Sequence, residues 1–181
     1  MELTEPWKNI VINYSHLVIS SCFDMWKQLI KTLKNYKSLT IDENIILENS
    51  FVIFYEFLIL LLHLTDRSIV KLLKDKERNI FMNALIQKTD SDLIRSSFNT
   101  NINKDLYWME LYNLRQKEYS KYRIGTKKGN PQRGDIFWEF GKQIANLLNH
   151  PLSPEIVTSA YLIAADTFFS IILKSLSLNK K

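Results

Sequence analysis

Residues 51–64 read FVIFYEFLILLLHL, an apolar run that contains one carboxylate, Glu56, and one imidazole, His63. Fourteen residues are too few to span a membrane as a helix. Just ahead of the run, residues 40–43 fit a capping box, with Thr40 as the N-cap and Glu43 returning the hydrogen bond. We therefore predict a largely buried helix that runs to about Leu64.

The segments on either side are helical in pattern as well. Apolar residues recur at helical spacing from Trp7 to about Tyr36, and the opposite polar face includes Lys27 and Lys31. A helix of that length measures about 45 Å, which is the full length of a domain of this size. After Leu64 the chain either turns or kinks into a third helix. We predict further helices that begin at Thr65, Thr89, Lys104, Asp135 and Ser153.

The composition agrees with an all-α protein. The chain has 181 residues, of which 46% are hydrophobic, and only four glycines and four prolines. So little turn chemistry argues against a many-stranded sandwich or barrel. We find no strand-period alternation, internal repeat or linker. The prediction is one helical domain over 1–181, a bundle of five or six main helices with long N-terminal and C-terminal helices, a basic glycine-containing loop at about 123–134 and a frayed tail at 177–181.

Charge and cysteine usage indicate the compartment. Twenty-four Lys and Arg face 19 Asp and Glu, a net charge of +5, which suits an acidic or phosphate-bearing partner without requiring one. The single Cys22 excludes an intramolecular disulfide and a multi-cysteine metal site. A free thiol suits a reducing cytoplasm, and the acidic first residues do not resemble a signal peptide. We expect a cytoplasmic protein with no membrane span.

A polar stripe follows the second predicted helix. Asn49, Glu56, His63 and Arg67 are spaced 7, 7 and 4 residues apart, which places them within about 40° of one another. A carboxylate, an imidazole and a guanidinium in line could act as acid, base and anion clamp. Glu56 and His63 lie about 10 Å apart along the axis, however, so they cannot touch. We favour a solvated or internally paired stripe over a catalytic site.

Asp166 interrupts an apolar run, 156–173, near the C-terminus. We expect this run to be a buried helix, because a carboxylate in the middle of a lipid-spanning segment is costly. A buried Asp166 needs a partner, and Arg67 and His63 are candidates. The favoured interpretation is a structural ion pair. The alternative is a polar pocket formed by Glu56, His63, Arg67 and Asp166.

A basic, aromatic segment occupies 108–133. Aromatic and basic side chains recur at helical spacing and continue into the glycine-containing loop. Basic groups bind phosphates, and interleaved aromatic rings can stack on bases, although we expect most of these rings to be core. The candidate partner-binding residues are Arg115, Arg123, Lys127, Lys128 and Arg133. Aromatic anchors are expected among Phe137, Trp138 and Phe140.

The sequence contains no catalytic signature such as a nucleophile elbow or a helical zinc motif. We therefore expect a non-catalytic binding protein of the bacterial cytoplasm, with no cofactor and no metal, that engages a macromolecular partner, most simply a protein. An immunity, antitoxin or regulatory role is expected by analogy of size and class alone. Two alternatives stay open: a nucleic-acid-binding protein that uses 108–133, and an enzyme that uses the polar pocket. A homodimer is also left open.

Overall fold

The computed structural model describes residues 5–36, 39, 41–70, 72–95, 104–125, 134–151 and 153–178. Within these ranges the structure is helical and contains no strand, which confirms the all-α prediction. Six main helices are present, and the last continues through a π-helical segment, η1, into α7. Their bounds are α1 Glu5–Lys34, α2 Glu43–Ile69, α3 Asp75–Arg95, α4 Lys104–Tyr119, α5 Ile136–Leu147, α6 Pro154–Thr167, η1 Phe168–Ile172 and α7 Leu173–Leu178.

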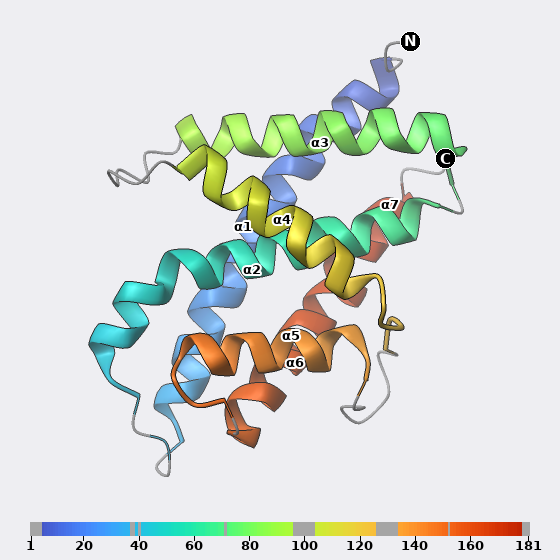
Figure 1. Ribbon diagram of the computed structural model, residues 1–181. Helices are drawn as coiled ribbons and strands as arrows, with labels where there is room; N and C mark the ends of the chain where they lie inside the picture. The colour runs from blue at the N-terminus through green and yellow to red at the C-terminus, as the bar shows by residue number, and fades with distance from the viewer. Residues whose placement is uncertain are drawn as a thin grey trace.

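Helix α2 forms the centre of the fold (Figure 1). Its residues from Ile53 to Thr65 are all buried, because this stretch is apolar on nearly all sides and its few polar side chains are paired within the protein. Helices α1, α3, α4 and α5 and the segment η1 all contact it. Sequence periodicity alone could not show this arrangement, since a helix that is apolar all round has no preferred inner face.

The long first helix crosses α2 and connects α3 to α6 (Figure 1). It contacts α3 and α6 as well as α2. Ser15, in its N-terminal half, donates a hydrogen bond to Asp92 of α3, and Tyr36, just past its end, accepts one from Ser159 of α6. The predicted helix over 7–36 is thus confirmed to within two residues at each end.

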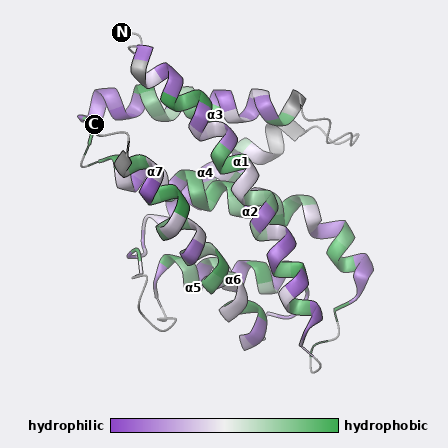
Figure 2. Ribbon diagram, turned by 180° about the vertical axis from the view of Figure 1, so that it is seen from behind, coloured by the Kyte–Doolittle hydropathy of each residue, from purple (hydrophilic) through white to green (hydrophobic). Residues whose placement is uncertain are grey.

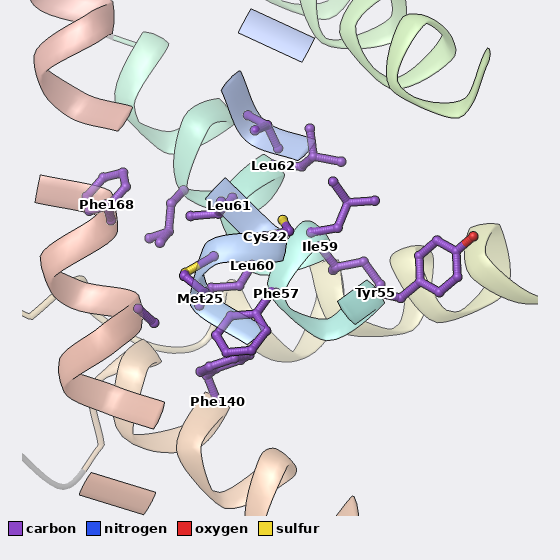
Figure 3. Packing of buried hydrophobic residues seen from close by; sticks show 14 of the residues in the cluster. Cys22, Met25, Tyr55, Phe57, Ile59, Leu60, Leu61, Leu62, Phe140 and Phe168 are labelled. Atoms are coloured by element: carbon purple, nitrogen blue, oxygen red, sulfur yellow. The ribbon is translucent and has the colours of Figure 1, made fainter. Parts of the chain in front are cut away.

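The hydrophobic core takes side chains from every helix. Figure 3 shows Cys22 and Met25 of α1 beside α2, with Phe57 of α2 against Phe140 of α5. Cys22 is fully buried, and burial raises the pKa of its thiol well above the usual value. Cys22 therefore acts as a small apolar core residue and is not an exposed nucleophile.

Helices α5 and α6 pack closely because a glycine lies at their contact. A Cβ atom at Gly141 would lie 2.5 Å from the backbone oxygen of Val157, so no larger residue fits without displacement. Both helices begin as predicted. Asp135 caps α5 by accepting a hydrogen bond from the backbone of Trp138, and Ser153 caps α6 by accepting one from Ile156, with Pro154 in the first turn.

Three predicted helix boundaries are wrong. Thr65 does not start a new helix: its hydroxyl donates to the carbonyl of Leu61 within α2, which continues to Ile69. The third helix starts at Asp75 and runs through Thr89 to Arg95, so no separate short helix begins at Thr89. The N-cap of α2 is Asp42. Thr40 lies outside the described residues, as do 179–181 of the predicted frayed tail.

Candidate functional site

Glu56, the acidic member of the predicted stripe, forms a buried ion pair with Arg115 of α4. Arg115 Nη2 lies 2.6 Å from Glu56 Oε1, and Arg115 Nε lies 2.9 Å from both carboxylate oxygens. The hydroxyl of Tyr119 donates to Glu56 Oε2 at 3.2 Å. The side chains of Glu56 and Arg115 are 1% and 12% exposed. Both oxygens of the carboxylate are therefore already bound within the protein.

The rest of the Arg115 guanidinium is also engaged. Its Nη1 binds Glu118, and its Nη2 donates to Oε1 of Gln143 on α5 at 3.3 Å. Burial lowers the pKa of Arg115, but the hydrogen bonds and charge of Glu56 outweigh burial and raise it overall. Arg115, a predicted partner-binding residue, is thus 12% exposed and engaged in the contact between α2 and α4.

His63, two turns after Glu56 on α2, also faces α4. Its Nδ1 donates to Oε1 of Gln116 at 2.5 Å, and its ring packs edge-on against Tyr119. His63 Nε2 and Gln116 Nε2 are buried and have no hydrogen-bond partner among the described residues. Burial lowers the pKa of His63, so the ring is neutral at pH 7.

Arg67, the last residue of the stripe, binds the turn that follows α4. Its Nη1 donates to the backbone oxygen of Tyr122 at 2.6 Å. Glu56, His63 and Arg67 thus bind Arg115, Gln116 and Tyr122 in order, and the stripe attaches α4 to α2. Asn49, the remaining member of the stripe, donates to the backbone oxygen of Ile45 in its own helix. Three of the four stripe residues are thus paired with residues of α4 or of the turn that follows it.

The predicted burial of Asp166 is wrong. Asp166 lies on the exposed side of α6 and accepts a hydrogen bond from Ser170 at 3.1 Å. Neither Arg67 nor His63 contacts it. The four candidate pocket residues therefore do not come together.

The basic glycine-containing loop at about 123–134 is described only at its two ends. Lys127, Lys128 and Arg133 lie outside the described residues. Arg123 lies at the start of the loop, where its backbone oxygen accepts a hydrogen bond from the backbone N–H of Ile136 at 3.0 Å. The predicted loop at about 123–134 thus begins and ends beside the first turn of α5.

A buried carboxylate lies beside these two ends. Asp135 accepts a hydrogen bond from the hydroxyl of Tyr161 at 3.0 Å while it caps α5. A Cβ atom at Gly125 would lie 2.5 Å from Asp135 Oδ2, so a larger residue there would have to displace the Asp135 carboxylate. Sequence reasoning identified the cap but missed the role of Gly125.

The aromatic stripe of α4 is core, as expected. Trp108 and Tyr119 are each 1% exposed, and the Trp108 ring stacks on Tyr55 of α2. The indole N–H of Trp108 donates to Asp90 of α3 at 2.8 Å. These rings are not available to stack on bases. The expected anchors Phe137 and Phe140 are also fully buried, so neither lies on a contact surface.

One cluster that the sequence did not reveal joins a serine, a histidine and an aspartate. Ser15 Oγ donates to Asp92 Oδ2 at 2.8 Å, and His16 Nε2 lies 3.5 Å from the same oxygen. Lys88 also binds Asp92. Nucleophilic catalysis would require the hydroxyl to donate to the imidazole. Here it donates to the carboxylate, so the cluster links α1 to α3 without activating Ser15.

The end of α1 and the start of α2 lie at the lower left of Figure 1. Side chains from these two helix ends line an apolar groove on the described surface. Its volume is about 600 Å³. Four apolar side chains and four charged ones line it: Trp26, Ile30, Ile46 and Leu47, with Lys27, Lys31, Lys34 and Glu43. Leu47 is 70% exposed. Figure 2 shows hydrophilic and hydrophobic residues side by side along this part of α1.

No protein-family model, curated protein or solved structure matches this chain. The site must therefore be interpreted from its own geometry.

Two stretches of helix are long and apolar enough to cross a membrane by length and composition alone, α2 and the continuous helix Pro154–Leu176. More than half of the most apolar window of each is buried inside the fold. Core helices of soluble proteins pass the same test, so the finding is weak evidence for a membrane. The expectation that the chain has no membrane span stays a prediction.

Proposed function

We propose that this protein binds a partner protein without catalysing a reaction, and that the partner docks in the groove between α1 and α2. The observation that carries the proposal is the groove itself. It combines an open apolar floor with a lysine rim, and a large apolar side chain, Leu47, stands exposed at its edge. Concave apolar surface bordered by charge is typical of recognition sites.

The internal pairing of the polar residues favours binding over catalysis. A general acid or base must reach its substrate. Glu56, however, is held by Arg115 and Tyr119, and Arg67 is held by the backbone of Tyr122. His63 is 4% exposed and lies behind Gln116.

A protein partner also fits the groove better than a nucleic acid does. In the basic, aromatic segment 108–133, the rings of Trp108 and Tyr119 that would stack on bases are buried, and Glu56 compensates the charge of Arg115. A phosphate backbone has no apolar side chains with which to cover Trp26, Ile30 and Ile46. A protein segment supplies both apolar and charged groups.

Site-specific photo-crosslinking in cells of the protein's own host tests the proposal. A photoreactive amino acid replaces Leu47, and the matched control replaces Leu162, an exposed leucine on α6 that is 52% accessible. We expect a discrete adduct with another protein from position 47, absent from position 162 and weakened by Lys27→Glu with Lys31→Glu. No adduct at position 47, or an adduct only with a second copy of this chain, would contradict the proposal.

A further inference from the structure

The lysines of the groove form a regular row on α1. Lys27, Lys31 and Lys34 are spaced four and three residues apart, so they fall within about 60° of one another and rise by about 6 Å and then 4.5 Å along the helix. All three are exposed. No carboxylate among the described residues pairs with Lys27 or Lys31. Lys34 pairs with Glu43 at 3.2 Å, with both side chains largely in solvent.

The apolar residues of the groove lie beside this row. Trp26 and Ile30 come from α1, and Ile46 and Leu47 come from α2. Trp26, Ile30 and Ile46 are each half-buried, so their remaining surface faces the groove. An occupant must therefore carry an apolar side next to a negatively charged one. The lining has three lysines and one glutamate, a net charge of +2, which repels a basic occupant.

We infer that the groove takes an acidic amphipathic helix of the partner protein, with its carboxylates opposite Lys27, Lys31 and Lys34 and its apolar face on the floor. This inference rests on the proposed function. A helix carries carboxylates on one face at intervals of three and four residues, which is the spacing of the lysine row. Helices that lie in grooves are recognised through apolar anchors at the same periodicity.

Other anionic occupants match the row less well. A fatty acid has one carboxylate, so it leaves either Lys27 or Lys31 without a partner, while Lys34 keeps Glu43. A nucleic acid supplies enough charge but no apolar face for Trp26 and Ile46. The row spans about 10 Å, or two helical turns, so a segment of about three turns covers it. Charge then gives specificity and the apolar floor gives affinity.

Fluorescence anisotropy with synthetic helical peptides tests the inference. The probe is a labelled, stapled 15-residue peptide with glutamates at i, i+4 and i+7 beside a leucine face. Its controls carry glutamine or lysine at those positions, or a central proline. Dodecanoate and a short DNA duplex serve as competitors. We expect the acidic helix to bind at least about tenfold more tightly than the glutamine, lysine or proline peptide, and neither competitor to displace it.

Charge reversal on the protein gives the second arm. Lys27→Glu with Lys31→Glu should weaken binding of the acidic peptide by about tenfold or more and create binding of the lysine peptide. The matched control, Lys76→Glu with Lys121→Glu, makes the same change of charge at exposed lysines outside the groove and should change affinity less than about threefold. Circular dichroism and thermal melts confirm that both variants fold.

Each result decides the matter. Equal binding of the acidic and glutamine peptides, displacement by dodecanoate or DNA, or equal effects of the two charge reversals would overturn the inference. If the peptides fail while position 47 still crosslinks to a protein in cells, the inference falls and the proposed function stands. If both fail, both are wrong.

Discussion

Arg115 of α4 binds both carboxylate oxygens of Glu56 at the centre of α2, with Nη2 2.6 Å from Oε1 and Nε 2.9 Å from each oxygen. The pair is largely shielded from water, with Glu56 1% and Arg115 12% exposed, and it is supported by Tyr119 and Gln143. A buried ion pair of this kind fixes which faces of two helices meet. It is the main polar contact between α2 and α4.

Breaking this pair from one side should be costly. Arg115→Met leaves the Glu56 carboxylate buried without a cation, and we expect it to lower the free energy of unfolding by about 3–5 kcal/mol. Glu56→Leu combined with Arg115→Met removes both charges and should recover most of that loss. Urea denaturation followed by circular dichroism measures both variants. A loss below about 1 kcal/mol in Arg115→Met would show that the pair does not hold α4 in place.

The stability of the protein should depend on pH through His63. Burial lowers the pKa of His63 in the folded protein, with Gln116 and Asp66 opposing that effect and Arg67 adding to it. The unfolded chain therefore binds a proton before the folded one does. The contribution of neutral His63 to the free energy of unfolding is therefore present above about pH 6.5, and it is lost as the pH falls from there toward the folded-state pKa.

Replacing His63 with a residue that does not titrate tests the direction of this pH dependence. His63→Asn retains a side-chain amide that can donate to Gln116 but does not ionise. Melting temperatures between pH 7.5 and pH 5.5 should fall more steeply for the wild type than for this variant. Parallel curves would show that His63 does not contribute.

Gly141 should tolerate no side chain. Alanine there places its Cβ 2.5 Å from the backbone oxygen of Val157, which cannot move without shifting α6. We expect Gly141→Ala to destabilise the protein by about 1–3 kcal/mol despite the better helix propensity of alanine. Lys142→Ala, on the exposed side of the same helix, is the control and should be nearly neutral. A Gly141→Ala variant as stable as its control would mean that α5 and α6 are not in close contact.

Glu43 should oppose the binding of an acidic partner. It is the carboxylate on the rim of the groove, and it engages Lys34. Glu43→Gln frees Lys34 and removes a like charge, so affinity for the acidic peptide should rise by about two- to fivefold. Glu48→Gln, an exposed carboxylate on α2 outside the lining, is the matched control. Weaker binding of Glu43→Gln would indicate that Glu43 itself contacts the ligand.

Local signals in the sequence predicted much of the fold. Asp135 and Ser153 mark helix starts because capping needs only neighbouring residues. The length of α1 followed from its apolar spacing. The predicted helix starts at Thr65 and Thr89 were wrong, because a threonine before an apolar stretch has the same local pattern whether it caps a helix or lies within one.

The candidate site depended on contacts that are distant in sequence. Arg115 is 59 residues from Glu56, and no local pattern pairs them. Asp166 was placed wrongly because a helix that is apolar on nearly all sides gives no direction for its one acid. The groove was missed although Lys27 and Lys31 were recognised as a polar face, since its other wall, Ile46 and Leu47, belongs to another helix.

Comparative purification from the native host tests the central claim most directly. Proteins bound to the wild type are quantified by mass spectrometry beside three variants: the groove variant Lys27→Glu with Lys31→Glu, the matched variant Lys76→Glu with Lys121→Glu, and the loop variant Lys127→Glu, Lys128→Glu and Arg133→Glu. We predict a partner protein whose recovery falls at least about tenfold with the groove variant alone. Undiminished recovery with the groove variant, or loss only with the loop variant, would contradict the account.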